Sequence, residues 1–231
     1  MNTPTLSPAE LHILERLGGR RWTVKRFTPE AVKAAKQEWK ATHNAVGFAT
    51  SRWMTTDETN PKLGKSGLPT LGITIHSARH ALAAWKATDL LVRHDLATAV
   101  GSTVLGVERV LRHTACPMST KGCRGGCVTA ESVNALNERS QRARLARHVF
   151  LMFRPASAFA LTADHLDRAC EKYGRRGARY RVNVSDDIRF ELLAPGLFSV
   201  APRPYAYTKW TPEQRPGRPG FRLVYSGSER T

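Results

Sequence analysis

The spacing of apolar residues predicts two helices near the N-terminus. Residues 7–10, Ser-Pro-Ala-Glu, form a capping box with proline at the first helical position, and apolar residues then recur at helical spacing until Gly18. A second helix begins at residues 28–30, Thr-Pro-Glu. We therefore expect residues 1–50 to form a basic helical N-terminal region, followed by a second domain over residues 51–231.

Four short apolar or alternating stretches predict the strands of an α/β sheet. They span residues 71–75, 179–187, 204–210 and 221–226. The first, Leu-Gly-Ile-Thr-Ile, is β-branched and follows Pro69, as expected for a buried central strand. The fourth ends the pattern, and the prolines between the third and fourth strands indicate a stiff connecting loop.

A wholly helical pattern over residues 77–113 contains helix-turn-helix spacing. Ala97 is followed by Gly101 four residues later and by Val107 six residues after that, so a small residue, a turn and an apolar anchor stand in the expected order. The recognition helix and its approach would then carry Ser102, Thr103, Leu105, Gly106, Arg109 and Arg112. The alternative is an ordinary helical hairpin that packs on the core.

Three of the four cysteines, Cys116, Cys123 and Cys127, lie within twelve residues. Thiolates are soft ligands for zinc and for iron–sulfur clusters, and three of them can hold a 4Fe-4S cubane whose fourth iron is open. Zinc would need a fourth ligand, for which His113 and His148 are candidates. Free or disulfide-bonded thiols are the third interpretation. We favour the iron–sulfur cluster among the three.

The helical patterns after the cysteines make two further predictions. A long helix over residues 130–153 carries four arginines around a broad arc, which indicates a general basic surface. These are Arg139, Arg142, Arg144 and Arg147. In the next helix, residues 162–173, Cys170 shares an apolar face with Leu166, Ala169 and Tyr173 and is expected to be a core thiol instead of a ligand.

The strand over residues 179–187 delivers Ser185, Asp186 and Asp187 at its carboxyl end. Ligands in open α/β sheets bind at this end of the strands. The two carboxylates could therefore hold an amine or another polar ligand near the cysteines. Equally, they could cap the next helix.

The charge of the chain favours a polyanionic partner. Thirty-six Lys and Arg against nineteen Asp and Glu leave a net charge of +17, and neutralising phosphates releases counterions, so we expect nucleic acid, DNA above all, or a host nucleic-acid-processing protein. Arg20 and Arg21 beside Trp22 suit a phosphate-contacting turn, and a solvated loop is the alternative. No apolar run would span a bilayer and no signal peptide is evident, so we expect a cytoplasmic protein.

An ordered series of motifs over residues 60–231 resembles the phage gene product 88 family. The motifs are residues 60–64, 71–74, 116–119 with Cys123 and Cys127, 181–188, 205–209 and 223–226. The order of strand, three-cysteine loop, helix and strand is also similar to the partial barrels of radical S-adenosylmethionine enzymes. These resemblances imply a partial (βα) barrel-like sheet of about four strands, with residues 77–115 as a helical insertion, in a protein of the host cytoplasm.

We therefore expect a phage iron–sulfur protein that binds nucleic acid through its basic surface and the segment over residues 96–112. One alternative, implied by the resemblance, is an enzyme that binds S-adenosylmethionine at the open iron, with Ser185, Asp186 and Asp187 beside it. Another is a DNA-binding protein with a structural zinc ion on three cysteines and a histidine.

Overall fold

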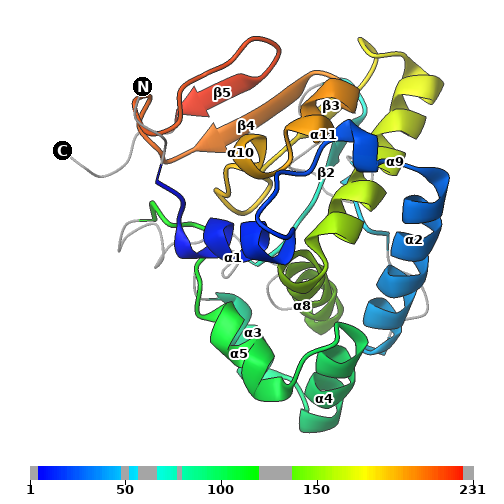
Figure 1. The fold of residues 1–231 in the computed structure, drawn as a ribbon, viewed down its shortest axis with the longest axis vertical. Helices are drawn as coiled ribbons and strands as arrows, with labels where there is room; N and C mark the ends of the chain where they lie inside the picture. Colours follow the sequence, from blue (N-terminus) through cyan, green and yellow to red (C-terminus); the bar gives the residue numbers. More distant parts are fainter. Residues whose placement is uncertain (1–4, 48–51, 57–66, 77–79, 120–136, 226–231) are drawn as a thin grey trace.

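Five short strands form one sheet in the computed structural model, which describes residues 5–47, 52–56, 67–76, 80–119 and 137–225 (Figure 1). They are β1 Thr55–Thr56, β2 Thr70–Gly72, β3 Arg179–Arg181, β4 Pro204–Thr208 and β5 Arg222–Tyr225. The strands lie in chain order, with β2 to β5 parallel and β1 antiparallel to β2. The predicted α/β class is confirmed, whereas a partial barrel is not.

The four predicted strands all occur, but their hydrogen-bonded ladders are shorter than the apolar runs. The ladder of β2 ends at Gly72, although the chain stays buried through Ile73 and Ile75. An apolar run records burial, and burial continues where strand pairing has ended. The two-residue strand β1 was not predicted, because so short a segment carries no periodic signal.

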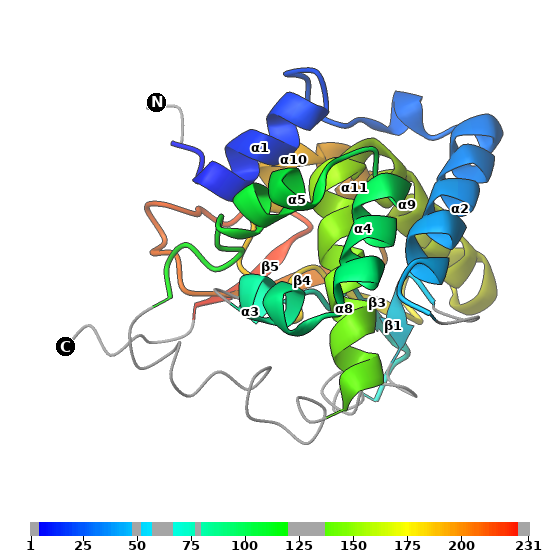
Figure 2. The same cartoon turned by 90° about the horizontal axis from the view of Figure 1, so that it is seen from below.

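Helices cover the sheet and supply most of the core (Figures 1 and 2). They are α1 Pro8–Arg16, α2 Pro29–Asn44, α3 His80–Ala87, α4 Leu90–Ala99, α5 Val104–Leu111, α8 Glu138–Phe153, α9 Pro155–Tyr173, α10 Phe190–Leu193 and α11 Pro195–Val200, with the 3-10 turn η1 Val24–Arg26. Helix α2 packs on α9 and α1 on α8, so the N-terminal helices share one hydrophobic core with the sheet. No helix among the described residues is both long and apolar enough to cross a bilayer.

Helix α8 lies at the centre of the core. Every residue from Leu145 to Phe153 is buried, and Phe150 packs edge-on against Trp39 and Trp53 with ring centroids 5.3 and 5.4 Å apart. A helix that is surrounded by other elements buries all of its faces. This helix therefore joins α1, α2 and α3 into one unit, as Figure 2 shows from below.

The predicted basic surface of this helix is wrong for two of its four arginines. Arg144 and Arg147 are 9% and 7% exposed. Arg147 donates from Nε and Nη2 to the carbonyl oxygen of Arg52 at 3.3 and 2.8 Å. Burial lowers the pKa of Arg147 to about 10. Arginines spread around a helix predict exposed side chains. The Arg52 carbonyl that binds Arg147 is 95 residues away in the sequence, so the sequence pattern does not reveal it.

The apolar face predicted for residues 162–173 is confirmed in part. Leu166 and Ala169 are buried, whereas Tyr173 is 39% exposed. Cys170 is half-buried and its Sγ donates to the carbonyl oxygen of Val200 at 3.4 Å. Burial raises the pKa of this thiol, as expected for a structural residue.

The capping box of α1 also makes a long-range connection. Glu10 Oε2 accepts from the Ser7 N–H at 2.8 Å, and Ser7 Oγ accepts from the Glu10 N–H at 3.3 Å, as the sequence predicts. The same carboxylate accepts from Arg189 at its backbone N–H, Nε and Nη2, at 2.8, 3.0 and 2.8 Å. Both side chains are buried, and the Arg189 guanidinium lies 4.0 Å from the ring centroid of Trp210.

Replacing Glu10 by Gln should lower the free energy of unfolding by about 3–5 kcal/mol, because a buried guanidinium would lose its counter-charge. Urea denaturation measures the loss. Glu15→Gln, at an exposed position of the same helix, is the control and should change stability by less than about 0.5 kcal/mol. Equal stability of the two variants would contradict the buried pair.

Candidate functional site at the carboxyl edge of the sheet

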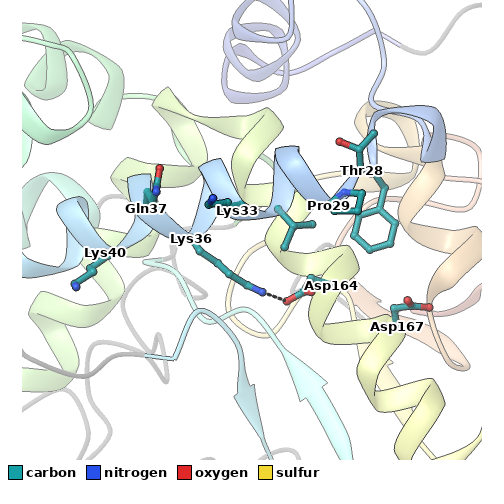
Figure 3. Close-up of a pocket in the computed structure, with 10 residues that line it drawn as sticks. Thr28, Pro29, Lys33, Lys36, Gln37, Lys40, Asp164 and Asp167 are labelled. Carbon is teal, nitrogen blue, oxygen red and sulfur yellow. Dashed lines mark ion pairs between the residues drawn. The ribbon is translucent and has the colours of Figure 1, made fainter.

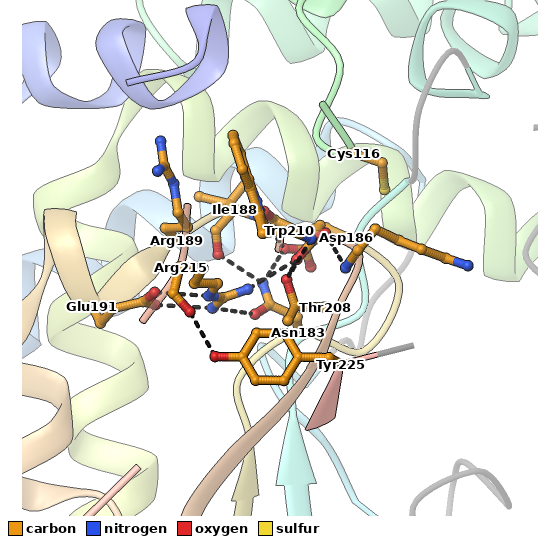
Figure 4. Close-up of polar contacts among 12 residues, drawn as sticks. Cys116, Asn183, Asp186, Ile188, Arg189, Glu191, Thr208, Trp210, Arg215 and Tyr225 are labelled. Atoms are coloured by element: carbon orange, nitrogen blue, oxygen red, sulfur yellow. Dashed lines mark hydrogen bonds and ion pairs between the residues drawn. The ribbon is translucent and has the colours of Figure 1, made fainter. Parts of the chain in front are cut away.

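The first cysteine of the three-cysteine loop lies at the carboxyl edge of the parallel strands (Figure 4). Its Sγ donates to the carbonyl oxygen of Ser185 at 3.7 Å, a weak contact typical of a thiol. One residue earlier, the carbonyl of Ala115 accepts from the Asp187 N–H at 2.8 Å. Ser185 Oγ in turn donates to the carbonyl of Ile75 at 2.5 Å. Cys116 is therefore fixed where the chain leaves β2 and β3.

A tight turn leads the chain away from Cys116. The N–H of Cys116 donates to Thr114 Oγ1, and the N–H of Ser119 donates to the Cys116 carbonyl, both at 3.1 Å. Cys123 and Cys127 lie outside the described residues. Within the described part, no three His, Cys, Asp or Glu side chains are grouped so that they could hold a metal ion.

Both predicted carboxylates have partners inside the protein. Asp187 Oδ1 accepts from Thr208 Oγ1 at 2.7 Å and from Arg215 Nη1 at 2.9 Å, and its Oδ2 accepts from the Lys209 N–H at 2.8 Å. The Trp210 indole also donates to the Asp187 carbonyl at 2.9 Å. This carboxylate therefore joins the end of β3 to the end of β4.

Asp186 closes a turn and does not cap the next helix. Its Oδ1 accepts from Asn183 Nδ2 at 2.6 Å and from the Ile188 N–H at 3.3 Å. The N-cap of α10 is Arg189, which makes no side-chain cap bond. The capping interpretation is therefore wrong, because the two-residue reach from Asp186 to Ile188 closes a local turn before the helix begins.

Arg215 is the centre of this network, and the sequence analysis missed it. Its Nε and Nη2 bind the two oxygens of Glu191 at 2.7 and 2.9 Å, and Nη2 also donates to Asn183 Oδ1 at 3.0 Å. The side chain is 1% exposed although it lies in the loop between β4 and β5. A single arginine in a proline-rich loop has no periodic neighbour that would mark it as buried.

Burial sets the protonation of the two carboxylates. It raises the pKa of Asp186 to about 7, against the hydrogen bond from Asn183. It also raises the pKa of Asp187 to about 6, although Arg215 and the Lys209 N–H favour the charged form. Burial therefore favours the neutral form of both side chains, and their hydrogen bonds within the protein hold them in fixed directions.

Two buried histidines meet where the chain after β2 packs on α8: His76 follows β2, and His148 is part of α8. His148 is a predicted zinc ligand. His148 donates from Nδ1 to the His76 carbonyl at 3.2 Å, and His76 donates from Nε2 to the Gln141 carbonyl at 3.1 Å. Burial lowers the pKa of His148 to about 4 and that of His76 to about 3, so both rings are neutral at pH 7. The Nε2 atom of His148 has no hydrogen-bond partner in the described part of the chain.

The other predicted zinc ligand, His113, follows α5. Its ring lies 6.0 Å from that of His12, centroid to centroid, at the junction with α1. The structure therefore places the two candidate histidines in different surroundings: His148 is buried in the core, and His113 is half-buried beside α1.

The residues predicted to bind nucleic acid lie on two surfaces. Arg20 and Arg21 are exposed. The neighbouring Trp22 is buried, and its backbone N–H donates to the Leu193 carbonyl at 2.8 Å. Helices α4 and α5 pack together across a turn at Gly101, whose φ is +69°. Ser102, which is half-buried, and the N-cap Thr103 follow that turn, whereas the exposed Arg109 and Arg112 lie at the other end of α5.

The model of one protein family, described as Gene product 88, matches residues 72–231. The chain belongs to the Gene product 88 family. No curated protein and no solved structure matches it. The region shared with the Gene product 88 family contains all three loop cysteines, Ser185 to Asp187 and Arg215, whereas α1 and α2 precede it.

The contribution of His148 to the stability of this Gene product 88 protein should fall as the pH is lowered from 6.5 towards 4. An unfolded histidine, with a pKa near 6.5, binds a proton in this range, whereas folded His148 does not, so the stabilisation present above pH 6.5 is lost on acidification. Each such group contributes up to about 1.4 kcal/mol per pH unit.

Urea denaturation between pH 7 and 4.5 measures this dependence for the wild type and for His148→Gln. The difference between the two curves isolates His148 from Asp186 and Asp187, whose raised pKa values act in the opposite direction. His94→Gln is the control, since the His94 side chain is 69% exposed. Parallel curves for wild type and His148→Gln would show that the ring titrates normally.

Proposed function

We propose that this Gene product 88 protein binds an iron–sulfur cluster through Cys116, Cys123 and Cys127, and that it binds nucleic acid through its basic surface. The observation that carries the first half is the position of Cys116. Its thiol lies at the carboxyl edge of four parallel strands, against Ser185. Ligands of parallel α/β sheets bind at this edge.

The chemistry of the loop favours a cluster with three thiolate ligands. Three thiolates in twelve residues satisfy three irons of a cubane and leave the fourth for another ligand. Gly122, Gly125 and Gly126 reduce steric limits on the loop backbone, so its N–H groups can approach sulfur. The cluster would be a structural element or a redox sensor.

The buried network around Arg215 would support that site from the protein side. It fixes Asp187, whose N–H holds the Ala115 carbonyl next to the first cysteine. Groups that orient the ligands of a metal site tune its affinity and potential. Asp187 already makes three hydrogen bonds within the protein and is 4% exposed, so an amine of S-adenosylmethionine would have to reach a buried carboxylate that is paired with Arg215. This favours a binding protein over the radical enzyme.

A zinc ion on the three cysteines and His148 is the second candidate. The observation in its favour is the fixed tautomer of that ring, which donates from Nδ1 to a carbonyl and carries a lone pair on Nε2. Metal-bound imidazoles commonly donate their other N–H to such an acceptor.

Protein purified without oxygen should be brown and absorb broadly near 400 nm, as thiolate-ligated clusters do. Changing Cys116, Cys123 or Cys127 to Ser should remove the absorbance and the acid-labile sulfide, because each loses an iron ligand. Cys170→Ser is the matched control and should retain both, since that thiol bonds the Val200 carbonyl. Stoichiometric zinc without acid-labile sulfide would contradict the cluster and favour the zinc site.

The second half of the proposal rests on the α4 and α5 pair. Ala97 and Val107 are buried where the two helices meet, and Gly101 provides the turn, as in a helix-turn-helix unit. Leu105 is 74% exposed and Arg109 is exposed on α5, so an apolar and a cationic side chain face outward together. Such residues suit thymine methyl groups and phosphates in a major groove.

Replacing Arg109 and Arg112 together by Ala should weaken binding of duplex DNA and reduce the slope of log affinity against log salt by about 1.8, because two phosphate contacts would be lost. Fluorescence anisotropy of a labelled duplex measures both quantities. The control removes the same charge at the exposed residues Arg176 and Arg222. Equal losses from the two double variants would favour a general basic surface over a recognition helix.

A further inference from the structure

A groove of about 680 Å³ lies between α2 and α9 (Figure 3), and its lining includes none of the described residues around Cys116. We call it the α2 groove, and its lining residues are Phe27, Thr28, Pro29, Val32, Lys33, Lys36, Gln37, Lys40, Asp164 and Asp167. It combines three kinds of surface: an apolar part at the start of α2, a row of lysines along α2, and two carboxylates on α9.

The lysines form one stripe on the exposed side of α2. Lys33, Lys36 and Lys40 follow one another at spacings of three and four residues, so they share a helix face. The rise from the first to the last is about 10 Å, so the three ammonium groups can follow neighbouring phosphates of one strand. Lys36 pairs with Asp164 at 3.2 Å, and Arg168 shares that carboxylate at 2.9 Å. Two cations therefore already balance Asp164.

Positive charge continues beyond the groove at the N-terminal end of α2. The preceding turn η1 contains Lys25 and Arg26, and the exposed Arg20 and Arg21 come shortly before it. These four residues and the lysine stripe place seven cations within residues 20–40, against Glu30 and Glu38. A linear polyanion that follows α2 would therefore meet cations along its whole path. A small anion would contact only one or two of these cations, so the row of cations favours a polymer.

The apolar and acidic parts of the groove suit an unpaired base. Phe27, Pro29 and Val32 offer an aromatic and aliphatic surface on which a base can stack, whereas the bases of a duplex are already stacked on one another. The exposed carboxylate of Asp167 can accept from the amino groups of a base, which Watson–Crick pairing would occupy in a duplex. An acidic peptide would use the lysines, but the Asp167 carboxylate would repel its acidic side chains.

We propose that the α2 groove binds single-stranded nucleic acid, with the lysine stripe on phosphates and a base over the apolar part. The proposal rests on the nucleic-acid half of the proposed function and names its strand type and a second contact surface. It depends neither on the cluster nor on α4 and α5. The α2 side of the groove, residues 27–40, precedes the region matched by the family model, whereas Asp164 and Asp167 lie within that region.

The test compares two double variants with the same change of charge. Lys33→Gln with Lys40→Gln removes two groove cations and leaves the Lys36 pair with Asp164 intact. Arg176→Gln with Arg222→Gln removes two exposed cations elsewhere. Binding of a labelled single-stranded 20-mer of mixed sequence is measured by fluorescence anisotropy from 50 to 200 mM salt, and circular dichroism checks that each variant is folded.

The groove variant should bind the single strand at least about tenfold more weakly at 50 mM salt, and its salt slope should be smaller by about 1.4, at 0.7 per lost phosphate contact. The control variant should bind within about twofold of wild type. Equal losses in both variants would overturn the proposal. If an acidic peptide at constant ionic strength displaces the single strand at a lower concentration than an unlabelled strand of the same length does, the groove belongs to a protein partner instead.

The same assay with a duplex separates the two proposals. If the duplex binds through Arg109 and Arg112 while the single strand is insensitive to Lys33 and Lys40, only the groove assignment fails. If neither nucleic acid binds at 50 mM salt, the nucleic-acid half of the proposed function fails as well.

Discussion

The buried guanidinium of Arg215 is the interaction on which the carboxyl edge of the sheet depends. It binds Asp187, Glu191 and Asn183 at 2.7 to 3.0 Å, and so connects the end of β3, helix α10 and the loop before β5. Removing one partner of such a network leaves another charge buried without compensation, which costs far more than the pair itself contributes. The position of Cys116 follows from this constraint, because Asp187 holds the backbone next to it.

A second buried pair gives the N-terminal helices the same dependence. Glu10 joins α1 to Arg189, two residues beyond Asp187, so the helix cap and the sheet edge share one continuous polar layer. Both arginines are connected to α10, because Arg189 is its N-cap residue and Arg215 binds Glu191 within it. The N-terminal region and the sheet therefore stabilise each other, although the family model begins only at residue 72, at the end of β2.

Local features of this fold could be predicted from the sequence, and the long-range polar contacts could not. The capping box of Ser7 and Glu10 and the turn at Gly101 depend on residues close in sequence, so their spacing reveals them. The bond from Glu10 to Arg189 joins residues 179 positions apart, and no periodicity marks it. Ser185 could be predicted to lie near the site because the carboxyl ends of parallel strands share an edge. The partners of Asp187 within the protein could not be predicted in this way.

The central claim is that three cysteines hold an iron–sulfur cluster at the sheet edge where Cys116 lies. X-ray absorption at the iron and zinc edges, on protein purified without oxygen, tests it most directly. The account predicts iron bound to sulfur with a second iron as a near neighbour, because a cluster contains both. Zinc bound to sulfur and imidazole nitrogen, with no iron above background, would contradict it.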